Sequence, residues 1–188
     1  NKQGKVVISL KYERVHKFEK GSGVVVRNGK FGLINRQGKL VVPIKYDDSP
    51  NWSSDKGLYN INDKGGVVID SNGKIIVPAA KYDYIMFFRE GLALVGKKIG
   101  GEFKGGFINK KGKEVVKPKY DEVGNFSEGL AIVRIGNWEK GYYGFINKKG
   151  KEIIKPKYDA VGNFSEGLAK VSKKGKYGFI DRKGKEII

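Results

Sequence analysis

Acidic residues recur at two fixed places in the sequence, and paired carboxylates could perform general acid and base chemistry. A glycosidase would need two of them about 5 to 10 Å apart in different environments. Carboxylates that recur once per repeating segment are better explained as acceptors for loop N–H groups or as partners of neighbouring lysines. No D-x-D-x-D-G calcium loop is present. We therefore expect structural roles for Glu90, Glu128 and Glu166, each before Gly-Leu-Ala, and for Asp47, Asp83, Asp121 and Asp159, each after Lys-Tyr.

The composition excludes several other kinds of catalysis. The chain has one histidine, His16, and no cysteine, so it lacks a Cys nucleophile and the usual ligands of a zinc site, and we do not expect His16 to serve a Ser-His-Asp triad. We expect His16 to be a surface or half-buried residue. The glycines from Gly96 to Gly106 lack the G-x-x-x-x-G-K-[S/T] pattern of a phosphate-binding loop. The sequence thus predicts no catalytic, metal or cofactor site, and a protein that is not an enzyme.

Two insertions carry the candidate binding residues. The segments 95–106 and 133–144 are each four residues longer than the equivalent segment 171–178. Because they join the same two strands in adjacent repeats, they should project side by side. Basic and aromatic side chains together suit stacking on sugars or bases, with charge contacts to phosphate or uronate. Alternatively, the insertions are only longer hairpin tips, with Trp138 folded onto the sheet. The candidate ligand-binding residues are Lys97, Lys98, Phe103, Lys104, Arg134, Trp138, Lys140, Tyr142 and Tyr143, and Trp52 is a weaker candidate.

The net charge of +18 favours acidic partners such as nucleic acid, an anionic cell-wall polymer or lipid headgroups. Only six of the 38 basic residues are arginine, so a second interpretation stays open, in which lysines on turns serve solubility. No apolar run is long enough to span a membrane. The chain starts at Asn1 inside a repeat, so a leader could have been removed. A secreted or cell-surface location is slightly favoured over the cytoplasm, and the compartment stays open.

A tandem repeat must position all of these residues. The segment [N/D]-x-x-G-K recurs at intervals of 34 to 39 residues. The sequence therefore predicts a single repeat domain over 1–188 without linkers. Its units are 1–34, 35–69, 70–108, 109–146, 147–180 and a partial unit, 181–188.

Each unit is predicted to hold three antiparallel strands. The first is G-L-A-x-V, in which Ala and Val should be buried while the variable residue, Leu94, Ile132 or Lys170, faces outward. The second is [Y/F]-G-[F/L]-I and the third is K-x-[V/I]-[V/I]. The K-Y-D-x-[V/I]-x-x-F segment that follows should be a loop whose tyrosine packs under the neighbouring unit. We expect no helix.

The turn between the second and third strands is the best specified feature. In Asn147-Lys148-Lys149-Gly150-Lys151, Asn147 suits the first position of a type I turn and Gly150 the left-handed position of a bulge. The same arrangement recurs in the other units. Proline should then end the third strand, because it cannot donate to the ladder. These prolines are Pro43, Pro78, Pro118 and Pro156.

The pattern [Y/F]-G-F-I-[N/D]-x-x-G-K-E-[V/I]-[V/I]-x-P-K-Y-D-x-V-x-x-F-S-E-G-L-A-x-V resembles the bacterial WG (or KWG) repeat. The resemblance covers nearly the whole chain. The aromatic-Gly pair of that family stands at Phe31-Gly32, Tyr143-Gly144 and Tyr177-Gly178, but is degraded to Gly65-Gly66 and Gly105-Gly106, so the array is divergent. The resemblance implies a repetitive, β-rich binding or structural module and brings no catalytic residues.

The two ends of the chain bear on how the units assemble. Residues 1–8 and 181–188 repeat the same strand. A closed five-bladed ring would need no duplicated strand, so an all-β array of stacked meanders, open at its ends, is favoured over a propeller-like ring. Exposed sheet ends make self-association possible.

These features lead to a ranked expectation of function. The first is a non-catalytic binding or scaffold module that presents a lysine-rich surface to an acidic polymer or a protein partner. The alternative is a nucleic-acid-binding protein that contacts the backbone without reading bases. A carbohydrate-acting enzyme is the remote alternative.

Overall fold

The computed structural model describes residues 8, 10–19, 21–52, 58–61, 66–137 and 139–187, with only the backbone at Trp52 and Tyr59. These residues form strands and turns without a helix, which confirms the all-β prediction. The chain divides into two compact units, Asn1–Phe87 and Phe88–Ile188, and each is described by itself.

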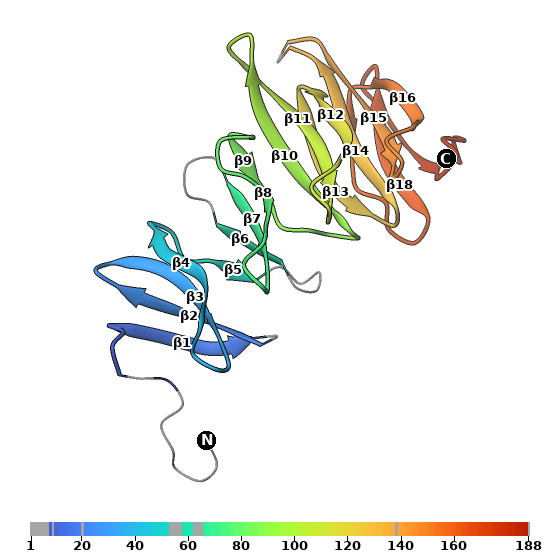
Figure 1. The fold of residues 1–188 in the computed structure, drawn as a ribbon. Helices are drawn as coiled ribbons and strands as arrows, with labels where there is room; N and C mark the ends of the chain where they lie inside the picture. The colour runs from blue at the N-terminus through green and yellow to red at the C-terminus, as the bar shows by residue number, and fades with distance from the viewer. Residues whose placement is uncertain are drawn as a thin grey trace. The chain divides into compact units, whose positions relative to one another are not determined.

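The first unit contains two antiparallel sheets (Figure 1), with strand orders β1-β2-β3-β4 and β5-β6-β7-β8. Their facing sides share an apolar core that includes Leu33 and Val42 from the first sheet and Ile61 and Ile69 from the second. The strands of this unit are β1 (Arg14–Glu19), β2 (Ser22–Arg27), β3 (Lys30–Asn35), β4 (Leu40–Tyr46), β5 (Asn51–Trp52), β6 (Leu58–Ile61), β7 (Val67–Asp70), β8 (Ile75–Val77) and β9 (Tyr84–Ile85).

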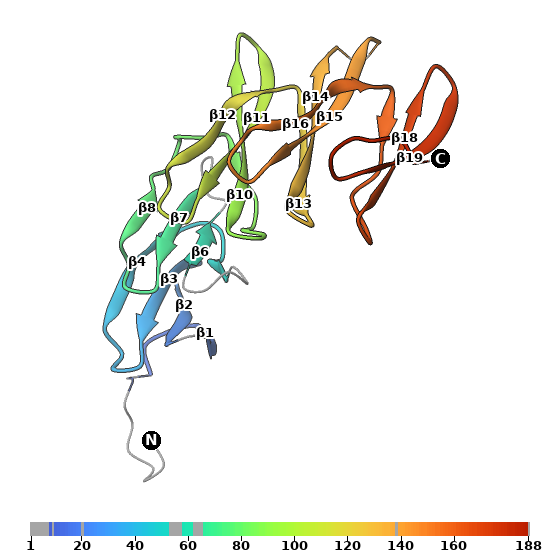
Figure 2. The ribbon, with the colours of Figure 1, turned by 90° about the vertical axis from the view of Figure 1, so that its right-hand side faces the viewer.

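The second unit contains three successive sheets (Figure 2), in which β10 to β12, β13 to β16 and β17 to β19 pair in chain order. Within each of these three groups, neighbouring strands pair in an antiparallel manner. The strands are β10 (Leu92–Ile99), β11 (Glu102–Asn109), β12 (Glu114–Tyr120), β13 (Glu122–Ser127), β14 (Leu130–Gly136), β15 (Gly141–Asn147), β16 (Glu152–Tyr158), β17 (Ala160–Val161), β18 (Leu168–Lys173) and β19 (Lys176–Asp181).

The segment after each Lys-Tyr-Asp was predicted as a loop, and this was wrong. It supplies an additional strand, such as β13, that pairs with the G-L-A strand. The register shifts between Val123 and Phe126, and this bulge hides the strict alternation by which a strand is recognised in a sequence. A two-residue turn, Glu128-Gly129, then connects β13 to β14.

Neighbouring sheets of the second unit share their interior. One core cluster joins Leu94, Phe107 and Tyr120 to Ala131 and Val133 of the next sheet. A second cluster joins β14 to β16 with β18 and β19 in the same way. The predicted packing of the repeated tyrosine under the neighbouring unit is thus confirmed for Tyr120.

Two aromatic pairs mark these sheet-to-sheet contacts. The rings of Phe107 and Phe126 meet edge to face with centroids 4.8 Å apart, and those of Phe145 and Phe164 do so at the same distance. Such a pair contributes about 0.5–1.5 kcal/mol beyond the buried area.

The variable residue of the G-L-A-x-V strand was predicted to face outward, which is wrong for Leu94 and correct for Lys170. Leu94 is only 5% exposed, and Ile132 packs against the second core cluster. The sheet of β13 to β16 is covered on both faces, on one by β10 to β12 and on the other by β17 to β19. Alternation therefore does not separate a buried face from a solvated one.

None of the described sheets closes into a barrel, which agrees with the predicted open repeat array. At the end of the chain, Ile180 forms a β-bridge with Glu186, and the N–H of Ile187 donates to the carbonyl of Phe179 at 2.8 Å. The partial last repeat thus pairs with its own preceding strand. Of its N-terminal copy, 1–8, only Ile8 is among the described residues.

The predicted Asn-x-x-Gly-Lys turn is confirmed. Asn147 Oδ1 accepts hydrogen bonds from the N–H groups of Lys149 and Lys151 at 2.9 and 3.0 Å, and Gly150 has a φ of 78°. The turns that begin at Asn35, Asp70, Asn109 and Asp181 are built in the same way.

Proline does not end the third strand, except at Pro78, which follows β8. Strands β4, β12 and β16 continue through Pro43, Pro118 and Pro156. These strands lie at the edge of their sheets, where a missing N–H costs no ladder bond. The register of each also shifts along the pairing with its neighbour.

The course of this edge strand explains why the second residue of the aromatic-Gly pair is glycine. A Cβ built on Gly144 would lie 2.4 Å from the carbonyl oxygen of Ile154 and 2.6 Å from the nitrogen of Pro156. A Cβ on Gly106 would meet the equivalent atoms of Val116 and Pro118 at 2.5 and 2.7 Å. The edge strand therefore passes too close for any larger residue.

Candidate functional site

The two insertions extend two hairpins of the second unit. In β10–β11, Lys97 pairs with Lys104 and Lys98 with Phe103, up to a tip at Gly100-Gly101. In β14–β15, the pairing continues to Gly136 and Gly141. Lys97 and Lys98 are exposed on the first hairpin. Trp138 lies outside the described residues, so its expected position on the sheet stays a prediction.

The hairpins project side by side, as expected. Residues of both line a pocket of about 510 Å³. Phe103 and Lys104 come from the first hairpin, Arg134 from the second, and Asp121 from the connection between their sheets. Three of the candidate residues, Phe103, Lys104 and Arg134, therefore line one pocket. Phe103 is 53% exposed.

Asp121 connects the two hairpins. Its carboxylate accepts hydrogen bonds from Lys104 Nζ and from the N–H of Gly136, the latter at 2.8 Å. Partial burial alone would raise the pKa of Asp121, but these two hydrogen bonds outweigh it, and the pKa lies below its usual value. The bonds to Asp121 and Glu102 raise the pKa of Lys104.

Arg134 is a buried candidate residue with internal partners. It is 6% exposed, and its guanidinium donates to the carbonyl of Asn137 and lies 5.7 Å from the centre of the Tyr143 ring. Because these partners hold it, Arg134 shapes the second hairpin rather than presenting a free charge.

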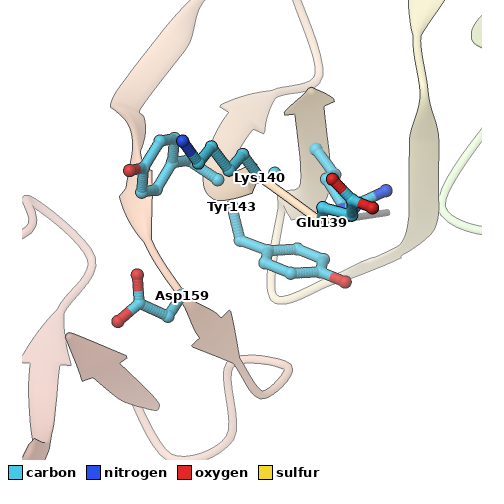
Figure 3. A pocket seen from close by; sticks show the side chains of 7 residues that line it. Glu139, Lys140, Tyr143 and Asp159 are labelled. Carbon is cyan, nitrogen blue, oxygen red and sulfur yellow. The ribbon is translucent and has the colours of Figure 1, made fainter. Parts of the chain in front are cut away.

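A second pocket, of about 360 Å³, is lined by residues of the same hairpin (Figure 3). The candidate residues Lys140, Tyr142 and Tyr143 line it together with Asp159, which comes from the end of β16. Tyr142 is 49% exposed. The Tyr143 hydroxyl donates to Glu122 at 3.2 Å, and partial burial raises its pKa. Asp159 was assigned only a structural role from the sequence.

Several of the repeated carboxylates accept hydrogen bonds from backbone N–H groups, as the sequence predicts, namely Glu90, Glu128, Asp121 and Asp159. Glu90 accepts from the N–H of Gly129 at 3.1 Å, and Asp159 accepts from the N–H of Lys174 at 2.6 Å. Sequence reasoning missed Glu13, which accepts from the N–H of Asn28 at 2.6 Å. The sequence feature that could have identified Glu13 is Lys11-Tyr12-Glu13, in which glutamate replaces the aspartate of the repeated Lys-Tyr-Asp.

Three further observations concern His16, metal ligands and the membrane. His16 is exposed, as predicted. Within the described ranges, no three His, Asp or Glu side chains gather where they could hold a metal ion. In the same part of the chain, no helix has the length and apolar character to cross a bilayer.

Exposed lysines line the outer strands and turns of the second unit. We define the lysine edge as nine exposed lysines on β12, on β16, on the turns before these two strands and at Lys185, none of which forms an ion pair with a carboxylate among the described residues. It consists of Lys111, Lys113, Lys117, Lys119, Lys149, Lys151, Lys155, Lys157 and Lys185.

Comparison with protein families accounts for the repeated geometry. The family model of the WG containing repeat matches residues 1–31, 31–64, 68–98, 106–137, 143–177 and 177–188. The chain belongs to the WG-repeat family. It is a WG-repeat module, and no curated protein matches it. Residues 99–105 and 138–142, at the hairpin tips, fall between the matched WG repeats. Phe103, Lys104, Lys140 and Tyr142 lie in these unmatched segments, and Lys104 and Tyr142 immediately precede the aromatic-Gly position of their repeats.

Proposed function

We propose that this WG-repeat chain is a non-catalytic binding module whose lysine edge contacts an acidic polymer or an acidic protein surface. The observation that carries the proposal is the absence of ion pairs at these nine exposed lysines within the described part of the chain. Unpaired charges of one sign attract and steer a partner of opposite charge.

The stacking of repeats makes the edge continuous. A Cβ built on Gly150 would lie 2.9 Å from the carbonyl oxygen of Val115, so this turn lies against the outer strand of the preceding sheet. Lys149 and Lys151 flank Gly150 and thereby approach the lysines of β12. A Cβ built on Gly184 would lie 2.9 Å from the side chain of Ile154 in β16, so the last turn also lies against the outer strand of the preceding sheet.

Cation–π contacts orient part of the edge. The Lys119 ammonium lies 4.8 Å from the centre of the Tyr120 ring, and that of Lys157 lies 5.0 Å from the centre of the Tyr158 ring. Each contact restrains a lysine side chain and reduces the entropy that it would lose on binding.

Nucleic-acid binding through the phosphate backbone is the alternative, since the same charge would serve it. A carbohydrate-acting enzyme is disfavoured because the repeated carboxylates Glu90, Glu128 and Asp159 are used as caps. The candidate residues Lys97, Lys98 and Phe103 at the first hairpin tip would extend the contact with a sugar or base.

Binding to polyglutamate, heparin, single-stranded DNA and neutral dextran at several salt concentrations tests the proposal. We expect salt-dependent binding of the three anions and none of dextran. The double variant Lys155→Gln, Lys157→Gln should reduce the slope of log K against log salt for DNA by about 1.5. The matched control Lys173→Gln, Lys174→Gln removes two exposed lysines outside the edge.

Equal losses in both double variants would mean that net charge alone binds, and would contradict a dedicated edge. Binding of DNA with little affinity for polyglutamate or heparin would favour the nucleic-acid alternative. Turnover of a glycan would overturn the non-catalytic assignment.

A further inference from the structure

Comparison of the repeats reveals a position where one of them departs from the others. The residue before the aromatic-Gly position is Lys30 in the first sheet and Lys104 in β11. Lys30 forms an ion pair with Asp47, and Lys104 forms one with Asp121. In β15 the equivalent residue is Tyr142, so this repeat lacks the ammonium group of that ion pair.

The aspartate of the same repeat remains in place. Asp159 Oδ2 accepts the N–H of Lys174 at 2.6 Å, whereas Oδ1 accepts no hydrogen bond from the residues that the structure describes. Asp159 is exposed and lines the pocket of about 360 Å³ with Tyr142 and Tyr143 (Figure 3). Two carboxylates, Asp159 and Glu139, and two aromatic rings thus line the pocket at the repeat position where a lysine ammonium stands elsewhere in the chain.

We propose that this pocket binds a primary alkylammonium group, such as a lysine side chain of a partner, through an ion pair with Asp159 and the ring face of Tyr142. Aromatic rings next to a carboxylate are a general solution for binding organic cations. This inference is independent of the lysine edge, which attracts the opposite charge.

The two cations that line the pocket leave this place open. Arg134 is held by the Asn137 carbonyl and the Tyr143 ring. Lys140 is exposed and forms no ion pair with Asp159. The net charge of +18 opposes cation binding at long range, so we expect an affinity in the millimolar range. The contact itself must supply the attraction.

Titration of the 188-residue chain, followed by NMR, tests the proposal. The probe is lysine blocked at both backbone ends, and the matched control is the equally blocked norleucine, which lacks the ammonium. We expect saturable shifts of the amides of Tyr142 and Lys174 with blocked lysine only. Lys174 is a direct reporter because its N–H donates to Asp159. Butylamine distinguishes a free alkylamine from a lysine side chain as the ligand. If butylamine binds as tightly as blocked lysine, the ammonium and its alkyl chain are sufficient for binding.

Three variants sharpen the test. Asp159→Asn keeps an acceptor for Lys174 but removes the charge, and should weaken binding about tenfold. Tyr142→Lys restores the internal ion pair and should abolish binding. Lys104→Tyr vacates the equivalent position beside Asp121 and should create a second site, seen as a new probe-dependent shift of Gly136, whose N–H donates to Asp121.

The proposal is overturned if blocked lysine causes no saturable shift, if norleucine binds equally, or if Tyr142→Lys binds like the unaltered chain. Lys140→Gln tests the rival in which Lys140 closes onto Asp159 in solution. Binding that appears only in Lys140→Gln would establish that rival and exclude the pocket as an open site.

Discussion

The carboxylate of Glu128 accepts a hydrogen bond from the N–H of Gly167 at 3.0 Å, 39 residues further along the chain. Glu90 and Gly129 repeat this bond at the same separation. Each glutamate has a positive φ, 51° for Glu128 and 50° for Glu90, a conformation that costs free energy in an L-residue. The bond between turns of successive repeats offsets that cost.

We therefore predict that Glu128→Ala lowers the free energy of unfolding by about 1–2 kcal/mol, the cost of losing a hydrogen bond to a charged acceptor. The matched control is Glu166→Ala, because Glu166 has a φ of 53° and no capping contact within the described structure. The loss of unfolding free energy in Glu166→Ala, measured by chemical denaturation, should be at most half of the loss in Glu128→Ala. Equal losses would mean that this bond contributes nothing.

Two buried tyrosines provide a second comparison. The Tyr120 hydroxyl donates to Glu152 at 2.9 Å, whereas the Tyr158 hydroxyl is buried and has no hydrogen-bond partner among the described residues. Tyr120→Phe should destabilise the chain by about 1 kcal/mol, while Tyr158→Phe should be neutral or stabilising. Thermal unfolding of both variants measures this. A larger loss for Tyr158→Phe would contradict the described environment of the two hydroxyls.

Gly144 tests the close approach of the edge strand. A Cβ there would meet the Ile154 carbonyl oxygen at 2.4 Å, so Gly144→Ala should cost about 2–3 kcal/mol. Gly162 is the control, since its Cβ would have no neighbour nearer than 3.8 Å. A folded Gly144→Ala protein as stable as Gly162→Ala would refute the role assigned to the aromatic-Gly glycine.

The ion pair of Asp121 predicts a pH dependence. Because the folded-state pKa of Asp121 lies below its ordinary value of 3.8, the stabilisation is fully present above that value and is lost as the pH falls through the folded-state pKa. The difference in unfolding free energy between the unaltered chain and Asp121→Asn should thus shrink below about pH 4. A difference that stays constant down to pH 2 (roughly the lower limit of carboxylate titration) would exclude the electrostatic contribution.

Local chemistry made part of this structure predictable. The Asn-x-x-Gly-Lys turn depends on side-chain acceptors and a left-handed glycine within five residues, so Asn147 and Gly150 could be assigned from the sequence. The position of the two insertions on adjacent hairpins followed from the repeat itself.

Features that depend on contacts between repeats could not be predicted. The outward position assigned to Leu94 was wrong because a single strand does not reveal that a second sheet covers its other face. The bulge between Val123 and Phe126 concealed a strand. The unoccupied ion-pair position at Asp159 became visible only when Lys104 and Asp121 were found together in three dimensions.

Successive repeats of the second unit share one interior. A double-mutant cycle of Phe145→Leu and Phe164→Leu, measured by chemical denaturation, tests it most directly. Rings whose centroids lie 4.8 Å apart should give a coupling free energy of about 0.5–1.5 kcal/mol. Strictly additive losses would contradict the packing of one repeat against the next.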